Sequence, residues 1–417
     1  MPSHTEKSSH NHRSHVLWTA EVASHTRDPL IKNPCWPVQN IMASSSGNMD
    51  QKTANVLFEE GAALVLLNVP PGTEFGIDYN SWNTGNRFKG VKMIPPGVHF
   101  VYYSAVNLKS RDCAPRTGFF HCFKPREIVI KRWDGGIEDL VDVKVTDSSD
   151  QDEKAQLQEN DPFLGAYPYE SLKRWVSLTN LISEDTVTRL SPLSGKIVSV
   201  AQLVPDMATR TTADRKLMAE ANKELLKSKN PEDHLPQMHR KAGTEIRFSK
   251  ISKQNYPEGA TPKEITKYSL DHTFTLDKLL LENYPTDSQG LLAELQLAFV
   301  CFLIGQVYDA FDQWKRLVHL LCSCIEAMST HSELYSTLVS VLHFQVREIP
   351  SDFFVDIVSS NNFLTVTLRD FFMNLTQSEA EGALKEKGRK FKKNLTKHFT
   401  WDFDEEPEDE APVVVDL

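Results

Sequence analysis

Short apolar runs separated by proline and glycine follow one another along the first half of the chain. The clearest are ALVLLNVPPGTEFGIDYNSW at 63–82, FKGVKMIPPGVHFVYYSAV at 88–106, RTGFFHCF at 116–123 and EIVIKRWDGG at 127–136. Proline cannot donate to a sheet ladder and glycine tolerates positive φ, so each Pro-Pro-Gly is predicted to be a turn between two strands. Short strands at such regular spacing predict a β-sandwich or barrel.

Beyond residue 150 the apolar residues recur at helical spacing. Residues 150–165 are expected to lead as a helix into a segment whose apolar stripe packs the end of the β-rich half onto its sheet. That stripe consists of Leu172, Trp175, Val176 and 178–181. Residues 243–251 are then expected to form a strand or an extended lead-in to the helical half.

The second half of the chain reads as one helix after another. Thr261 is predicted to cap the first of them, with Pro262 at its first position and Glu264 completing a capping box. Further helices are predicted at 291–304, 307–328, 332–345, 351–358, 363–375 and 379–399. Their succession predicts an all-helical bundle or superhelix.

Together these patterns predict an α+β protein with two folded domains, the first β-sandwich-like and the second all-helical. The predicted boundaries are a disordered leader at 1–52, the β-rich domain at 53–200, a linker at 201–242, the helical domain at 243–400 and an acidic tail with a terminal strand at 401–417. Within the leader Met42 is a more natural start than Met1, and we expect the residues before it to reflect an alternative start.

The net negative charge of the chain is concentrated at its C-terminal end. The net charge is -10, but eight acidic side chains lie within 401–417, where Lys and Arg do not occur, so the rest of the chain is nearly neutral. Binding to nucleic-acid phosphates requires a surplus of basic residues. Nucleic acid is therefore not an expected partner.

The cysteines and the hydropathy indicate an intracellular protein without a membrane span. Six cysteines occur without a CxxC pair, which is typical of reduced thiols rather than of a disulfide framework. The longest uncharged apolar stretch, 295–308, is shorter than the roughly 20 residues that span a bilayer, so it is predicted to be a buried helix. The expected location is the cytoplasm and the nucleus.

The sequence contains none of the motifs that would predict an enzyme. A phosphate loop, a GxGxxG turn, a GxSxG elbow and an HExxH helix are all absent from it. His319, Cys322 and Cys324 resemble a zinc cluster, but a fourth ligand is lacking, so they are predicted to be core residues. Asp78 and Glu74 are predicted to cap a surface turn. We expect no catalytic residue, no metal and no cofactor.

Two features near the C-terminus are not explained by core packing. In LKEKGRKFKKNLTKHF, Phe391, Leu395 and Phe399 form one apolar stripe, and seven Lys and Arg side chains cover the rest of the helix. The basic surface is either a solvated face or a binding surface for an acidic partner or for the chain's own acidic tail.

The tail itself is the second feature. Seven carboxylates lie between Asp402 and Glu410, and their mutual repulsion should keep this segment extended. Val413, Val414 and Val415 follow, and they are the predicted partner-binding residues, because an extended apolar segment can add a strand to another protein's sheet. The alternative is a strand that returns to the chain's own N-terminal sheet.

Long stretches of the chain resemble one family in the same order along the sequence. They are GTEFGIDYNSW, GVKMIPPGVHF, AYPYESLKRWVSLTN, GTEIRF, EGATPKEIT, ELQLAFVCFLIGQVYDAFDQWKRL, EIPSDFFVDIVS and PEDEAPVVV. These stretches resemble the family of splicing factors related to the yeast a-one-alpha-two-repression protein, and its vertebrate members above all. The resemblance covers nearly everything from about Thr53 to the end of the chain.

The resemblance implies a fold, a function and partners. The implied fold is an N-terminal β-sandwich-like domain, a linker and a helical domain similar to VHS superhelices, without enzyme activity. The implied function is assembly of the U5 snRNP. Family members bind the RNase H-like domain of the large U5 scaffold protein and, in some members, its MPN-like domain. This binding holds back the U5 helicase. Relatives run several residues past Leu417, which could weaken docking of the tail. The alternative function is that of a membrane-trafficking adaptor, because VHS-like domains elsewhere bind sorting signals.

Overall fold

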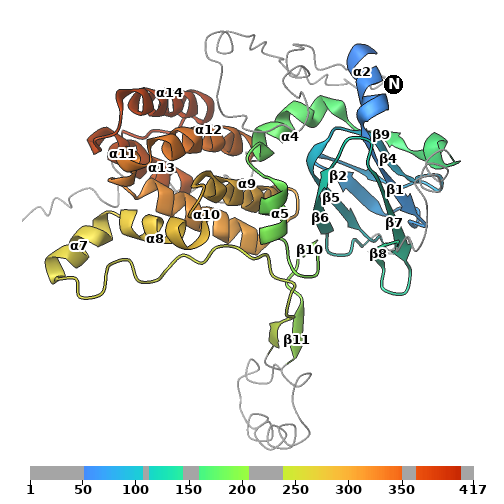
Figure 1. Ribbon diagram of the computed structural model, residues 1–417, viewed down its shortest axis with the longest axis horizontal. Coiled ribbons are helices and arrows are strands. Elements are labelled where there is room, and N and C mark those ends of the chain that lie inside the picture. The colour runs from blue at the N-terminus through green and yellow to red at the C-terminus, as the bar shows by residue number, and fades with distance from the viewer. Residues whose placement is uncertain (1–50, 107–111, 144–158, 206–237, 350–362, 405–417) are drawn as a thin grey trace, which may run out of the picture. The chain divides into compact units, whose positions relative to one another are not determined.

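The N-terminal half of the protein contains two five-stranded β-sheets. The computed structural model describes residues 51–106, 112–143, 159–205, 238–349 and 363–404. One sheet has the strand order β8-β7-β1-β4-β9 and the other the order β10-β6-β5-β2-β3 (Figure 1). The strands of the first sheet are β1 (Ala62–Leu67), β4 (Gly90–Ile94), β7 (Ile128–Asp134), β8 (Asp139–Asp142) and β9 (Gly165–Ala166). Those of the second are β2 (Glu74–Ile77), β3 (Asn80–Asn83), β5 (Gly97–Ser104), β6 (Thr117–Phe123) and β10 (Ile197–Val198).

The Pro-Pro-Gly segments form turns where the sequence predicted them. The first lies between β1 and β2, and its Gly72 has φ 88°; the second lies between β4 and β5, and its Gly97 has φ 141°. Both values lie in the region that glycine adopts without a steric cost. The sequence did not predict that β1 pairs in parallel with β7, although it pairs antiparallel with β4.

Short helices flank the sheets. They are α2 (Gln51–Glu60), the 3-10 turns η1 (Asp161–Phe163) and η2 (Tyr169–Ser171), α4 (Leu172–Thr179) and α5 (Glu184–Leu190). The helical stripe predicted at 172–181 is confirmed over α4, where Leu172, Trp175 and Leu178 are buried. Most of the helix predicted at 150–165 lies outside the described residues. The helix α2 was not predicted, because residues 51–60 show only one clearly buried apolar side chain, Leu57.

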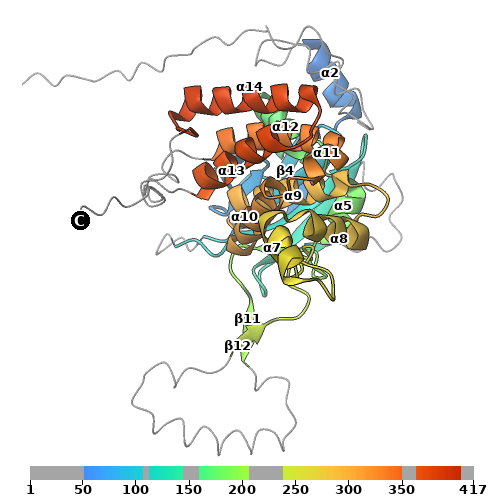
Figure 2. The same cartoon turned by 90° about the vertical axis from the view of Figure 1, so that its left-hand side faces the viewer.

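The predicted linker begins and ends in a small β-hairpin. Its strands β11 (Leu203–Pro205) and β12 (Met238–Arg240) pair antiparallel and form a sheet of their own (Figures 1 and 2). The residues between the two strands are outside the described part of the chain. Residues 243–251 are irregular in structure, so the predicted strand is wrong there and the alternative of an extended lead-in holds.

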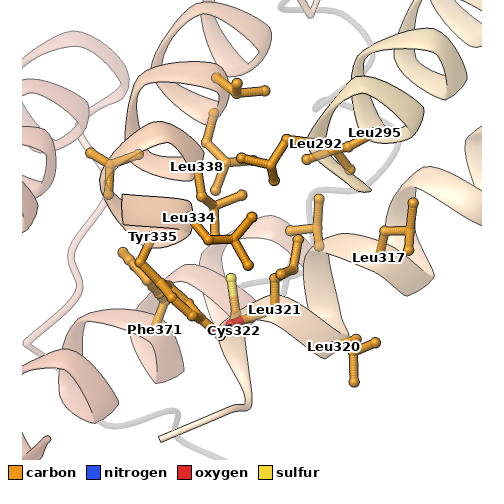
Figure 3. Packing of buried hydrophobic residues seen from close by; sticks show 14 of the residues in the cluster. Leu292, Leu295, Leu317, Leu320, Leu321, Cys322, Leu334, Tyr335, Leu338 and Phe371 are labelled. Carbon is orange, nitrogen blue, oxygen red and sulfur yellow. Dashed lines mark hydrogen bonds between the residues drawn. The ribbon is translucent and has the colours of Figure 1, made fainter. Parts of the chain in front are cut away.

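The C-terminal half is helical, as predicted. Its described helices are α7 (Pro262–Leu270), α8 (Thr273–Asn283), α9 (Gln289–Leu303), α10 (Tyr308–Cys322), α11 (Ala327–Thr330), α12 (Ser332–Glu348), α13 (Phe363–Gln377) and α14 (Gly382–Phe399). Side chains from α9, α10, α12 and α13 belong to one core, in which Leu321 and Leu338 lie between Leu295 on one side and Phe371 on the other (Figure 3). The helix predicted at 351–358 falls outside the described residues. The resemblance to VHS superhelices and the division into two domains remain predictions.

The central helix α9 contributes to two cores. Leu292, Leu295 and Phe299 belong to the helical core, whereas Val300 and Cys301 pack with the side chains of the sheets. A helix that is apolar on all sides must be covered on all sides. This arrangement confirms that the long apolar stretch is a buried helix, which here ends at Leu303. No helix in the described part of the chain is both long and apolar enough to cross a membrane.

The cap predicted for the first helix of this half is present. The Thr261 side chain accepts a hydrogen bond from the Glu264 backbone N–H, and the Glu264 carboxylate accepts one from the Thr261 backbone N–H. That hydrogen bond lowers the pKa of Glu264. Because α7 has no buried residue, the cap must contribute much of its local stability.

We therefore expect Thr261→Ala to fray α7 without unfolding the protein. Loss of an N-cap should lower the hydrogen-exchange protection of the α7 amides roughly fivefold. Thr266→Ala is the matched control, because Thr266 lies inside the helix and donates to the Pro262 carbonyl. Exchange measured by mass spectrometry checks the prediction, and equal protection in both variants would contradict it.

Candidate partner-binding surface at the C-terminal helix

The helix α14 is fixed to the helical core by the apolar stripe that the sequence predicted. Leu384, Phe391 and Leu395 are buried, and Phe399 packs against the same core at the helix end. Gly388 lies at the crossing with α13, where a Cβ atom would come within 2.3 Å of the Leu375 side chain. The small residue thus lets the two helices approach closely.

The basic side chains of α14 surround this stripe, and some of them are tied to neighbouring helices. Lys387 donates to the Ser336 carbonyl on α12, and Lys385 donates to the Thr376 carbonyl on α13. Arg389 and Lys390 both pair with Glu386, but their side chains remain 74% and 76% exposed. Arg389 lowers the pKa of the Glu386 carboxyl. Since Glu386 is the one acidic residue of this helix, α14 presents a strongly positive surface.

The chain turns back at the end of α14 and packs against it. Thr400 adopts the left-handed conformation with φ 59°, which reverses the chain. The Trp401 ring stacks on the Phe399 ring with centroids 4.7 Å apart. Phe403 is only 5% exposed, and its ring lies edge-on to that of Phe372 on α13. We call Trp401–Asp404 the tail root.

The tail root also makes one ion pair with the basic helix. Lys392 on α14 contacts the Asp404 carboxylate. The sequence predicted that charge repulsion keeps Asp402 to Glu410 extended, but the start of this segment is anchored on the helical half by one stacked and one buried aromatic side chain. The alternation of aromatic and acidic residues in TWDFDEE was the signal that sequence reasoning missed.

The predicted strand residues Val413, Val414 and Val415 lie outside the described part of the chain. Neither strand addition to a partner nor return to the chain's own sheet is tested by the structure. The described part of the chain ends at Asp404, which contacts Lys392 of α14.

Asp78 lies in a place that differs from the prediction. It is completely buried, and its carboxylate accepts hydrogen bonds from the Tyr167 hydroxyl at 2.5 Å and the Phe100 backbone N–H at 3.0 Å. His99 Nδ1 lies 2.7 Å from the same carboxylate, and its Nε2 lies 2.7 Å from the Pro95 carbonyl oxygen. The surface-turn interpretation is therefore wrong for Asp78.

Glu74 was paired with Asp78 in that prediction, but the two carboxylates have separate partners. Glu74 forms an ion pair with Arg116 at 2.8 Å, and Arg116 also donates to the Ile304 carbonyl at the end of α9. Asp78, His99 and Tyr167 are all buried, so their hydrogen-bond network is part of the core.

Of the three residues that resembled a zinc cluster, Cys322 and Cys324 are core residues, as predicted, whereas His319 is exposed. Cys322 and Cys324 are buried, and burial raises the pKa of both thiols, so neither is a ready nucleophile. Within the described residues the structure contains no group of His, Cys, Asp and Glu that could hold a metal ion.

Comparison with known proteins places the whole arrangement in one family. A sequence profile described as the AAR2 N-terminal domain matches residues 60–192, and one described as the AAR2 C-terminal repeat region matches residues 248–404. The Protein AAR2 homolog of Mus musculus is 48% identical over 377 residues, which cover 89% of this chain and 98% of the mouse protein. The chain belongs to the AAR2 family.

More distant AAR2 proteins align over most of the chain as well. The Protein AAR2 homolog of Caenorhabditis elegans is 40% identical over 366 residues, 86% of this chain and 99% of the relative. The protein named A1 cistron-splicing factor AAR2 in Saccharomyces cerevisiae is 21% identical over 335 residues, 77% of this chain and 86% of its own length. None of these names indicates a catalytic activity. The second AAR2 profile ends at residue 404 and so includes α14 and the tail root.

Proposed function

We propose that this protein is a non-catalytic assembly factor for the U5 snRNP in pre-mRNA splicing. It binds the RNase H-like domain and the MPN-like domain of the large U5 scaffold protein and thereby holds off premature association of the helicase. Membership in the AAR2 family and the name of the yeast relative as a splicing factor support this proposal. The protein acts in the cytoplasm and the nucleus, and it needs no cofactor.

The anchored tail root is the observation that carries the proposal. Trp401 and Phe403 fix the start of the tail on the helical half, so the tail begins at a defined point beside α14. A tethered segment binds at a high effective concentration once another part of the same protein has engaged the partner. Val413, Val414 and Val415 then add a strand to the sheet of the scaffold protein, with backbone hydrogen bonds supplying affinity and alternate side chains supplying specificity.

A binding assay with the purified full chain tests this function. The RNase H-like and MPN-like domains of the U5 scaffold protein are immobilised separately, and binding is measured by surface plasmon resonance. Val414→Pro should weaken binding to the domain that receives the strand by at least about tenfold, because proline removes a ladder donor and does not fit a paired strand. Asp416→Asn, which alters the same tail but not the valines, is the control.

The full chain should bind at least one of these domains. Failure to bind either would refute the proposed function, whereas binding that is equal for the parent and Val414→Pro would refute the role of the valines alone. Affinity purification from cells supplies a second test, in which recovery of U5 proteins supports the proposal and recovery of endosomal sorting proteins supports the trafficking adaptor.

A further inference from the structure

We propose that, in the free protein, the acidic residues 405–410 dock on a basic stripe of α14. The stripe consists of Lys385, Arg389, Lys392 and Lys393. The docked segment is a latch within one chain, which lowers the availability of the terminal valines to a partner. Docking of this segment would regulate the same tail that the proposed function uses. Only its consequence for partner binding rests on the proposed function.

The spacing of the four stripe residues places them along one side of the helix. They lie at positions i, i+4, i+7 and i+8, which are neighbours on a helical surface with 3.6 residues per turn. One edge of the stripe faces α13, since Lys385 donates to the Thr376 carbonyl of that helix. Phe403 packs against α13 too, so the tail root enters the surface on the side of the stripe.

The direction of the tail root leads the chain onto the stripe. Trp401 lies on Phe399 at the end of α14, and three residues later Asp404 lies on Lys392, which is seven residues closer to the helix start. The tail root therefore runs antiparallel to α14. If the next residues keep this direction, they pass Arg389 and then Lys385.

The lengths of the two elements match. The helix rises about 10 Å from Lys392 back to Lys385, and six extended residues reach up to about 20 Å. Residues 405–410 are thus long enough to follow the whole stripe. They do not need to leave the surface of α14 to do so.

The charges of the two elements are complementary. Residues 405–410 read EEPEDE and carry five carboxylates, and no Lys or Arg occurs in the chain after Lys397. The helix carries seven Lys and Arg and one Glu. One contact of the expected kind is already present at the boundary of the two elements, the ion pair of Lys392 with Asp404.

A latch of this kind is weak enough to be released. A single exposed ion pair contributes little to stability, but the anchored tail root keeps the acidic segment next to the stripe at a high local concentration. A partner that offers the valines a sheet edge can therefore displace the segment. High salt should release it as well, because the Debye length falls to about 3 Å at 1 M.

Limited proteolysis of the full chain tests the latch without any partner. A glutamyl endopeptidase cleaves after the glutamates of 405–410, and mass spectrometry follows the C-terminal peptides that are released. Rates are divided by the rate for a synthetic peptide of residues 403–417, which corrects for effects of salt on the protease. The stripe variant combines Arg389→Gln with Lys393→Gln.

The control variant combines Lys390→Gln with Lys397→Gln. It removes the same charge from exposed positions of the same helix, but these lie outside the stripe. We expect the stripe variant to release the peptides roughly three to ten times faster than the parent, and the control variant to release them at the parent's rate. In 1 M NaCl the parent should reach the rate of the stripe variant.

Two results would overturn the inference. The first is a stripe variant that is cleaved no faster than the parent at low salt. The second is an equal increase in both variants, which would mean that general attraction to a basic helix, rather than docking on the stripe, protects the tail. Because no partner is present, the outcome does not depend on whether the proposed function is correct.

Discussion

Replacing Glu294 by alanine should destabilise the protein by about 3–5 kcal/mol. Glu294 lies on α9 and is completely buried. Its carboxylate accepts hydrogen bonds from the Ser249 backbone N–H at 2.9 Å and from the Gln313 side chain at 3.0 Å. The Tyr284 hydroxyl donates to it as well, and the Arg189 guanidinium lies 3.5 Å away.

The size of this effect follows from the groups that the substitution leaves behind. The alanine variant would leave the buried Ser249 backbone N–H without its acceptor. It would also take one acceptor from the Gln313 side chain and from the Tyr284 hydroxyl, which keep Ser249 as a partner. An unpaired buried polar group carries its full desolvation cost, whereas the hydrogen bond it replaces is worth less. The carboxylate therefore joins residues from four segments of the chain, namely Arg189, Ser249, Tyr284 and Gln313.

Urea unfolding followed by circular dichroism measures the change. Glu294→Gln should cost less than the alanine variant, because an amide oxygen can still accept from the Ser249 N–H. Glu282→Ala is the matched control on an exposed position of α8 and should change the free energy of unfolding by less than about 0.5 kcal/mol. Equal free energies of unfolding for Glu294→Ala and Glu282→Ala would contradict the prediction that the buried Glu294 carboxylate stabilises the fold.

A second large loss of stability is expected from Asp78→Ala in the β-rich half, again about 3–5 kcal/mol. The variant would remove the shared acceptor of Tyr167, His99 and the Phe100 backbone N–H. Burial, together with the neighbouring Asp78 carboxylate, raises the pKa of Tyr167, so its hydroxyl stays protonated and requires an acceptor. Asp78 also has φ 54°, a conformation that alanine adopts less readily than aspartate.

Tyr167→Phe separates the contribution of one donor from that of the whole network. It should cost about 1 kcal/mol, since a single hydrogen bond is lost and the carboxylate keeps its other partners. The double variant with Asp78→Ala and Tyr167→Phe should lose less stability than the sum of the two single losses, because both substitutions break the same hydrogen bond. Asp142→Ala, whose side chain is 83% exposed in its ion pair with Lys131, is the surface control. Additive single effects would show that Asp78 and Tyr167 do not share a network.

The elements that the sequence predicted well are those with a strong local signal. The Thr261 capping box depends on residues within one turn of one another, and the Pro-Pro-Gly turns depend on the backbone preferences of the residues that form them. The stripe of Phe391, Leu395 and Phe399 was visible because helical spacing puts these residues on one face. In all three cases the interacting residues are close in sequence, so no knowledge of the remaining fold was needed.

The elements that were missed depend on contacts between distant residues. Asp78 looked like a turn residue, and it is one by its backbone conformation, but its acceptor role depends on Tyr167, which lies 89 residues away. Trp401 and Phe403 belonged by composition to a solvated acidic tail, yet Phe372 on α13 supplies the surface that buries Phe403. Residues 243–251 have the alternation of a strand, but no strand in the described part of the chain pairs with them.

Five features could be predicted from the sequence: the order of a β-rich half and a helical half, the positions of most helices, the basic surface of α14, the acidic charge of the tail and the family. Periodicity, capping and charge are local properties, so they can be read along the chain. Three other features became apparent only from the three-dimensional fold: α9 packs into two cores, Asp78 and Glu294 are buried acceptors, and the tail root is anchored beside the basic stripe. Each of these features depends on which distant side chains meet. A buried acidic residue requires hydrogen-bond donors from other segments, and a buried aromatic residue requires apolar neighbours, so burial holds these residues in place.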